Sequence, residues 1–472
     1  MNTGIITSVQ DVKFPFGRKI LFSLSGFSRM LASAMISTYA VYYYTDILGL
    51  SGTLVGIIIL ISKIWDIIND PMMGILVDRT RSKEGKCRYW LKFFSVPGGI
   101  VLAMMFIVPD FGTTGQAVWF AVTYIFQAMF HTVLCIPANA LIGRITSNQS
   151  ERSKINQIFM IFNLAGTYSL TAAAMPLVKL FGGEDLRKGF VGLAIVCGVL
   201  YALGFLTAAL ATKGYEPLEY LEEEHLSQKK GSASKTSLKE TLLALLRNNY
   251  WLLCVGVAFF SVLGEGTSLA SLVQHFQYNL GDMDLMTTYS VISVITTVIG
   301  ILSLGILTKK LGNAGTAFLA GVLGFAGWML RFVFSDASAT VFIVGFIIGA
   351  AGSGLVSAVI ILCLLDSRVY GHWKTGVDND AILMSGHTTA SKVGFAIGPS
   401  IGAMLLDVVN YVPQAAEQSE TVKNLFLIEN TLVPALGYGL VAVCAFFMLR
   451  LEKKLPQIKA ELEARAFNKT EE

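Results

Sequence analysis

The amino-acid sequence predicts an all-α membrane protein whose twelve transmembrane helices form two bundles of six. Three observations predict this class: an apolar composition, a series of twelve long apolar segments, and a polar stretch that divides the series in half. Hydrophobic residues make up 54% of the 472 positions and charged residues 14%, whereas soluble globular proteins carry roughly 25% charged residues. Most of the chain is therefore expected to lie in a lipid bilayer.

The apolar segments are long enough to cross a bilayer. A helix that spans the hydrocarbon core needs roughly 20 mainly apolar residues. Twelve segments meet this requirement, and we expect spans at about 20–49, 52–77, 92–110, 114–143, 155–181, 189–212, 249–278, 284–308, 313–335, 337–366, 381–408 and 430–450.

Two polar stretches define the domain organisation. One separates the sixth span from the seventh, and the other follows the twelfth; both read as solvated segments. The chain therefore divides into an N-terminal six-helix bundle, a cytoplasmic middle loop, a C-terminal six-helix bundle and a cytoplasmic tail, with bounds 1–212, 213–248, 249–450 and 451–472.

The placement of lysine and arginine predicts the orientation, because these residues are enriched in cytoplasmic loops. With both termini in the cytoplasm, the inner segments hold 28 of the 36 lysine and arginine residues. The outer loops then hold four, Lys179, Arg187, Lys188 and Lys423. We expect a multi-pass protein of the cell membrane with both ends inside.

The two halves also share a sequence phrase. Residues 74–79 read Gly-Ile-Leu-Val-Asp-Arg after the second span, and residues 305–310 read Gly-Ile-Leu-Thr-Lys-Lys after the eighth. Each phrase leads into a basic turn at the same position of its half. Parallel halves of this kind are the architecture of the major facilitator fold.

Other classes of protein are not indicated. The net charge of +4 is too small to predict a nucleic-acid partner. The six cysteines show no paired spacing, so we expect neither a disulfide framework nor a cysteine metal site. No catalytic triad, HExxH or Walker pattern stands out, so neither an enzyme nor a resident cofactor is expected.

The second span carries two carboxylates at positions that lipid disfavours. An ionisable residue deep in a span costs at least ~2.5–3.5 kcal/mol, so it normally faces a cavity. Asp66 and Asp70 are four residues apart and share a helix face, with Lys63 one turn earlier and Asn69 beside them. Because two nearby carboxylates repel each other, these oxygens suit a small cation or a proton. A structural Lys–Asp pair near the cytoplasmic helix end is the alternative interpretation.

The basic turn Asp78–Arg88 follows this span. Its cluster of charges resembles a catalytic site, but we interpret the turn as a structural hinge between the second and third spans. In this interpretation Asp78 pairs with a neighbouring helix.

Further ionisable residues lie within the expected spans. Arg29 and Lys392 are expected to face a cavity, where they would favour a ligand bearing a carboxylate, sulfonate or phosphate. Glu265, flanked by two glycines in the seventh span, is a candidate for a cavity wall or for a partner of these cations. Arg331, close to the outer end of its span, is expected to extend toward the membrane surface.

Several of these motifs together resemble one known family. The segments Tyr42–Asp46 (Tyr-Tyr-Tyr-Thr-Asp), Ile64–Gly74, Thr80–Lys86 and Tyr370–Gly376 are similar to those of the glycoside–pentoside–hexuronide:cation symporters, to which melibiose permease belongs. The resemblance covers essentially the whole chain. It implies that Asp66, Asn69 and Asp70 bind the coupling Na⁺ or H⁺, that Thr132 supplies a hydroxyl ligand, and that Lys392 links the sugar and cation sites.

The chain departs from the family at the sugar site. Melibiose-type members carry carboxylates in the first and fourth helices that hold sugar hydroxyls, and these positions are Met30 and Cys135 here. The family's sugar-stacking tryptophan is replaced by Asn139. A carboxylate accepts two hydroxyls at once, whereas sulfur is a poor acceptor. The resemblance therefore implies an intact cation site and an altered sugar site, with Arg29, Lys392, Glu265, Asn139 and Cys135 as candidate substrate-binding or coupling residues.

The expected function is symport of a glycoside or related sugar with Na⁺ or H⁺ by alternating access. The solute could be an anionic sugar such as a uronide, because Arg29 adjoins the lost carboxylate position. The alternatives are a cation-coupled transporter of a non-sugar amphiphile such as a lysophospholipid and, more remotely, a non-transporting membrane sensor. The family resemblance implies a monomer in the lipid bilayer.

Overall fold

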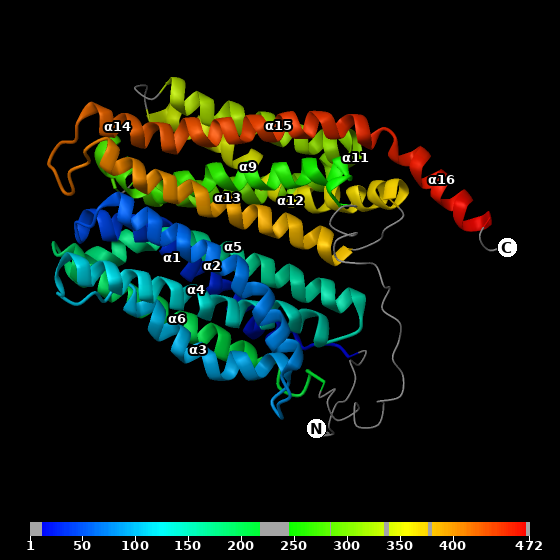
Figure 1. Ribbon diagram of the computed structural model, residues 1–472, viewed down its shortest axis with the longest axis horizontal. Coiled ribbons are helices and arrows are strands. Elements are labelled where there is room, and N and C mark those ends of the chain that lie inside the picture. Colours follow the sequence, from blue (N-terminus) through cyan, green and yellow to red (C-terminus); the bar gives the residue numbers. More distant parts are fainter. Residues whose placement is uncertain (1–11, 218–244, 284, 335–338, 376–379, 469–472) are drawn as a thin grey trace. The chain divides into compact units, whose positions relative to one another are not determined.

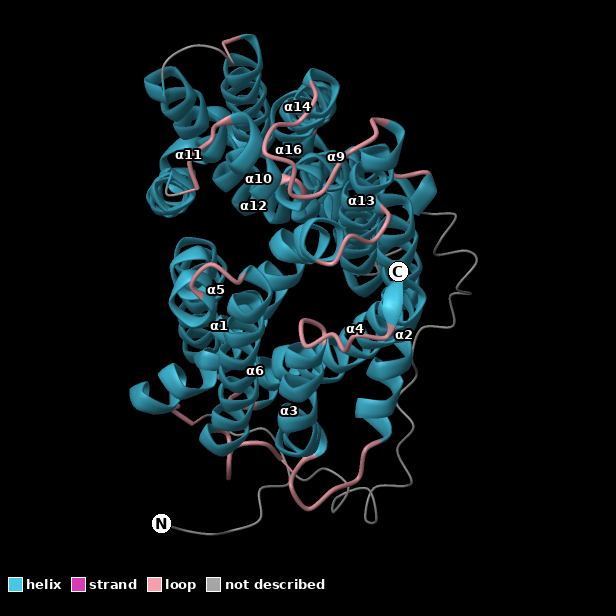
Figure 2. Cartoon of the chain, turned by 90° about the vertical axis from the view of Figure 1, so that its left-hand side faces the viewer, coloured by secondary structure: helices cyan, strands magenta, loops and turns pink. Residues whose placement is uncertain are grey.

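The computed structural model describes residues 12–217, 245–283, 285–334, 339–375 and 380–468, and every regular element in these ranges is helical. Figure 2 shows these helices in cyan, joined by loops. The expected middle loop, 213–248, lies largely outside the described residues. The chain divides into two compact units. Unit 1 comprises Met1–Gly231, Asp282–Ser290 and Leu406–Ala416, and unit 2 comprises Ser232–Gly281, Val291–Leu405 and Glu417–Glu472.

Unit 1 contains the helices of the N-terminal half (Figure 1). Within it α1 packs on α5 and α6, α2 packs on α4, and α3 packs on α4 and α6. The elements are α1 (Phe16–Tyr42), the π-helix η1 (Tyr43–Ile47), α2 (Gly52–Arg79), α3 (Lys86–Met104), α4 (Gly112–Arg144), α5 (Gln149–Gly182) and α6 (Leu186–Ala211).

Unit 2 contains most of the C-terminal half, and in it α9 packs on α12 and α15. A second π-helix again follows the first span, as it does in unit 1. The elements are α9 (Asn249–Ala270), α10 (Leu272–Gln274), η2 (His275–Asn279), α11 (Leu285–Val333), α12 (Ala339–Thr375), α13 (Asp380–Val408), α14 (Glu420–Leu427), η3 (Ile428–Leu432), α15 (Val433–Glu452) and α16 (Leu455–Asn468).

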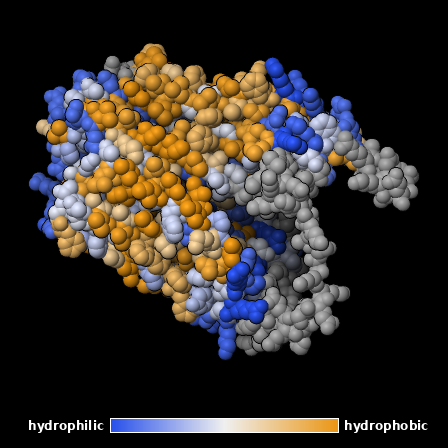
Figure 3. All heavy atoms as spheres, in the orientation of Figure 1, coloured by the Kyte–Doolittle hydropathy of each residue, from blue (hydrophilic) through white to orange (hydrophobic). Residues whose placement is uncertain are grey.

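The prediction of twelve transmembrane helices is confirmed. Ten helices of the described chain are long and apolar enough to cross a membrane. One of them, α11, is two helical segments joined at Gly312, where φ is 76°. The helix α3 is not among the ten; it has 19 residues and begins with Lys86, Arg88 and Lys92. Apolar side chains cover much of the face seen in Figure 3, as a lipid-facing surface requires.

The turn before α3 is held by a carboxylate from beyond α6. Glu216, which is 5% exposed, accepts hydrogen bonds from the backbone nitrogens of Cys87 at 2.7 Å and Arg88 at 3.0 Å. Gly85 precedes them with φ of 100°, and a Cβ there would lie 2.2 Å from the Glu216 carboxylate. The turn is therefore a structural element that Glu216 holds. Asp78, which was expected to pair with a neighbouring helix, is exposed.

In unit 2 a carboxylate caps a helix in the same way. Glu452, at the end of the last span, accepts hydrogen bonds from the backbone nitrogens of Asn313 at 2.6 Å and Ala314 at 3.1 Å. Gly312 again has positive φ, and a Cβ there would lie 2.8 Å from the carboxylate. A carboxylate after the sixth span of each half thus caps the helix that follows the shared sequence phrase. This agreement supports the internal repeat more strongly than the six-residue phrase does.

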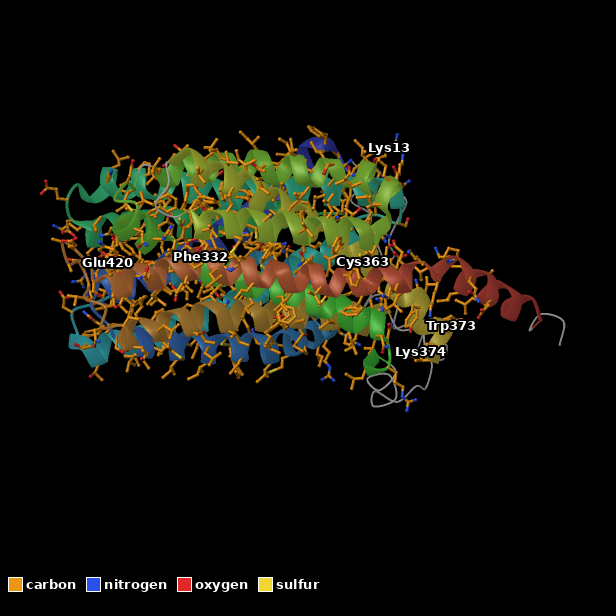
Figure 4. All side chains as sticks on the ribbon, turned by 90° about the horizontal axis from the view of Figure 1, so that it is seen from above. Lys13, Phe332, Cys363, Trp373, Lys374 and Glu420 are labelled. Atoms are coloured by element: carbon orange, nitrogen blue, oxygen red, sulfur yellow. The ribbon has the colours of Figure 1, made fainter. Side chains whose placement is uncertain are left out.

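The C-terminal tail differs from the solvated segment that we expected. Residues Leu455–Asn468 form α16, which packs on α12. Leu455 and Ile458 are buried, and Trp373, labelled in Figure 4, donates a hydrogen bond to Glu461 at 2.7 Å. The start of the tail is therefore part of unit 2.

Candidate functional site

The helix α2 has an apolar face and a polar face. Its exposed isoleucines and methionine recur every three or four residues and form one stripe, at Ile61, Ile64, Ile68, Met72 and Ile75. Asp66 and Asp70 each lie two residues beyond a member of this stripe, which is roughly 200° around a helix. The two carboxylates therefore point away from the lipid-facing stripe, on the side where α4 packs.

The carboxylates on this polar face contact Thr132 and Lys63. Thr132 of α4 donates a hydrogen bond to Asp70 Oδ1 at 3.0 Å. Lys63 Nζ lies 3.6 Å from Asp66 Oδ2, which is longer than a hydrogen bond. The structure thus brings together Asp70 and Thr132, as the family resemblance implies. The Lys63–Asp66 ion pair is also the arrangement that the alternative interpretation, a structural Lys–Asp pair, describes.

Asn69 adds an amide group to this face. No hydrogen bond from its nitrogen to the described residues fixes its orientation. Asn69 is 7% exposed, and its Nδ2 has no hydrogen-bond partner in the described part of the chain. A buried polar atom without a partner is unusual. Two carboxylates, an amide and a hydroxyl are hard oxygen donors and fit Na⁺ or a proton.

A second polar cluster surrounds Arg29 of α1. Its Nε donates to Asn163 Oδ1 of α5 at 3.0 Å, and its Nη1 donates to Asn139 Oδ1 of α4 at 2.9 Å. The guanidinium also lies over the Phe159 ring at 4.9 Å. These partners are neutral, and no described carboxylate forms an ion pair with Arg29. A half-buried positive charge is therefore held in one orientation without being neutralised.

At the altered sugar position on α4, Cys135 belongs to a network of polar side chains. Cys135 Sγ lies 3.4 Å from His131 Nε2, and the Tyr201 hydroxyl lies 3.3 Å from His131 Nδ1. Cys135 and Met30 are both half-buried. Neither can replace a carboxylate as an acceptor of two hydroxyls.

Glu265 lies in unit 2, where it lines a cavity of about 200 Å³. Tyr438 of α15 donates a short hydrogen bond to Glu265 Oε1, and the Ser353 and Tyr438 hydroxyls are 2.6 Å apart. The helix α9 remains regular here, and Gly264 allows the backbone at Pro434 to approach closely. Glu265 is therefore a cavity wall, as expected, and no described lysine or arginine forms an ion pair with it.

The two remaining cations of unit 2 differ. Lys392 is half-buried on α13, next to Ser391, which lines the same cavity. Arg331 is 1% exposed and lies over the rings of Trp328 at 4.6 Å and Phe342 at 4.2 Å. Its expected extension toward the membrane surface is wrong, because aromatic rings inside unit 2 cover the guanidinium.

Three polar residues within the spans were not singled out from the sequence. Asn163 holds Arg29, Tyr438 holds Glu265, and Gln127 of α4 is 1% exposed with both amide atoms unpartnered in the described chain. Each stands within a long apolar run. An amide or a hydroxyl in a membrane span is the signal that could have identified them.

Comparison with known proteins identifies similar chains. Residues 21–453 match the family described as MFS/sugar transport protein. The isoprimeverose transporter of Lactiplantibacillus pentosus is 30% identical over 453 residues, which cover 95% of this chain and 91% of that protein. A putative sulfoquinovose importer of Escherichia coli is 24% identical, over 96% and 95%. The crystal structure of a D-xylose-proton symporter has a TM-score of 0.64 at 14% identity, covering 92% and 97%, which shows the shared fold.

Proposed function

Because the chain belongs to the MFS/sugar transport family, the glycoside–pentoside–hexuronide:cation symporters, we propose that it couples the entry of Na⁺ or H⁺ to symport of a glycoside by alternating access. The chain is a membrane transporter of sugars and not an enzyme. The relatives named for isoprimeverose and sulfoquinovose support a sugar as the solute. In this proposal both termini are cytoplasmic and the protein acts as a monomer.

The polar face of α2 supports cation coupling. In the proposed cycle a cation binds Asp66 and Asp70, with Asn69 and Thr132 completing the oxygen ligands. A cavity that holds only one of the two ligands buries unpaired charge, which costs several kcal/mol. The empty and the fully loaded carrier therefore interconvert more easily than a half-loaded one, and this difference couples the two solutes.

Arg29 carries the proposal for the substrate class. Asn139 and Asn163 hold the guanidinium plane without neutralising it. A planar carboxylate or a sulfonate is a matching partner, because arginine binds such groups with two parallel hydrogen bonds. We therefore propose an anionic glycoside, such as a uronide, as the preferred solute.

Three methyl glycosides test this function because they differ at one carbon only. The β-D-xyloside carries hydrogen at C5, the glucoside a hydroxymethyl group and the glucuronide a carboxylate. Calorimetry measures binding to the purified protein, and proteoliposomes that contain the protein are used to measure counterflow. Each assay is run with Na⁺ or with N-methylglucamine, at two pH values. We expect the glucuronide to bind at least about tenfold more tightly than the xyloside, or about 1.4 kcal/mol, and counterflow to need Na⁺ or acid.

The same measurements can also contradict the proposed substrate class or the proposed function. Equal affinity for the three glycosides would remove the anionic preference and leave glycoside transport intact. Competition by lysophosphatidylcholine, with no competition by any glycoside, would overturn the sugar assignment. Binding without counterflow would indicate a sensor.

A further inference from the structure

The cavity of unit 2 is lined from four helices, α9, α12, α13 and α15. Glu265 is the one acidic residue among the described residues of its wall. The cavity has a volume of about 200 Å³. This space can admit a ligand of the size of a sugar ring. The lining residues are Ala258, Ser261, Val262, Glu265, Ser353, Val356, Ser357, Ile360, His387, Ser391 and Tyr438.

The serine hydroxyls of this wall are arranged as acceptors. Ser261, Ser357 and Ser391 each donate to a backbone carbonyl of their own helix, at 2.8, 2.9 and 3.1 Å. A hydroxyl has one proton and two lone pairs, so each of these oxygens can still accept. The wall therefore suits a ligand that brings several O–H donors.

Glu265 is the strongest acceptor of the wall. A carboxylate has about four lone-pair sites. The Tyr438 hydroxyl donates to Glu265 Oε1, and the Ser353 hydroxyl lies 2.6 Å from the Tyr438 hydroxyl. The Tyr438 contact orients the carboxylate, whose remaining lone pairs can accept further hydrogen bonds. His387 adds a buried Nδ1 without a hydrogen-bond partner in the described chain.

The rest of the wall is apolar. Ala258, Val262, Val356 and Ile360 contribute hydrocarbon from α9 and α12. A pyranose has hydroxyls at its edge and C–H groups on its faces, so it matches a cavity with acceptors on one part of the wall and hydrocarbon on another. An inorganic cation would gain nothing from the apolar part.

We propose that this cavity is a subsite for one pyranose ring, in which Glu265, oriented by Tyr438, accepts the hydroxyl groups of the sugar. The proposal rests on the proposed function and deepens it. The positions where melibiose-type relatives hold hydroxyls are Met30 and Cys135 here, and sulfur is a poor acceptor. Recognition of hydroxyls then falls to unit 2.

The test compares two cavity variants with two matched controls. Glu265→Gln keeps the shape of the side chain and removes its charge, and Tyr438→Phe removes the hydroxyl that orients it. Glu429→Gln changes another buried carboxyl of unit 2, which does not line the cavity, and Tyr250→Phe removes a buried hydroxyl that has no partner in the described chain. The probes are methyl β-D-xyloside and its 2-, 3- and 4-deoxy analogues.

We expect Glu265→Gln to weaken xyloside binding at least about tenfold and Tyr438→Phe to weaken it several-fold. In the wild type one or two deoxy analogues bind worse than the parent, and in Glu265→Gln this difference disappears. The controls keep wild-type affinity. Cation-induced stabilisation remains in every variant, because Asp66 and Asp70 lie in unit 1, and this response shows that each variant is folded.

Two failures are distinguishable. A wild type that binds no glycoside overturns the proposed function and the subsite with it. A wild type that binds xyloside while Glu265→Gln binds it equally well, with the same loss for each deoxy analogue, overturns the subsite alone. If Glu265→Gln loses its cation response, it is not folded, and Tyr438→Phe is used in its place. Its xyloside affinity and its loss of affinity for each deoxy analogue then decide whether the subsite is overturned.

Discussion

Asp70→Asn separates the electrostatic role of the polar face of α2 from its structural role. The asparagine can still accept the Thr132 hydrogen bond through its amide oxygen, so the contact at 3.0 Å survives and the charge is lost. At about 4 Å and an effective dielectric constant of about 20, a unit charge attracts a bound cation by about 4 kcal/mol. This is about a thousandfold in affinity.

The thermal stability of the cation-free protein should not fall along with the cation affinity. Asp66 and Asp70 repel each other across one helical turn, and the variant removes this repulsion. We therefore expect the cation-free Tm to be unchanged or higher, while the Na⁺-induced rise in Tm disappears. For a proton-coupled carrier, the corresponding loss is the uptake of protons on glycoside binding.

The assay is thermal unfolding of purified protein against Na⁺ from zero to 0.5 M at constant ionic strength, with proton uptake followed in weak buffer. Asp78→Asn is the matched control, because Asp78 is exposed on the same helix. A cation affinity within about threefold of wild type in Asp70→Asn, in both readouts, would refute the assignment of Asp70 as a ligand.

Three further predictions concern unit 1. Lys63→Met removes an ammonium group 3.6 Å from Asp66, which competes with the cation; Na⁺ affinity should rise several-fold in the same titration, and a fall would contradict this competition. Arg29→Gln removes charge-assisted hydrogen bonds of about 1.5–3 kcal/mol; glucuronide binding should weaken at least about tenfold in calorimetry while xyloside binding changes less than about twofold, and equal losses would indicate a structural role. Gly85→Ala introduces a Cβ at positive φ, 2.2 Å from the capping carboxylate; it should cost at least about 2 kcal/mol of stability, seen as a lower Tm, whereas Gly74→Ala, with open space around it, should leave Tm nearly unchanged, and similar Tm values for both would refute the capping geometry.

The sequence by itself determined the features that depend on local periodicity and composition. Twelve spans follow from apolar length, and the placement of Asp66 and Asp70 on one face follows from a spacing of four residues. The repeat of a phrase before Gly85 and Gly312 correctly predicted related turns. These inferences need only the geometry of a single helix and the low dielectric of lipid.

Tertiary structure decided which side chains meet. Glu216 caps a turn 129 residues earlier, and Tyr438 holds Glu265 across 173 residues. Arg29 finds amides 110 and 134 residues away, and aromatic rings of unit 2 enclose Arg331. Such partners depend on the rotation and axial register of one packed helix against another, and the spacing of residues within a single helix contains no information about either.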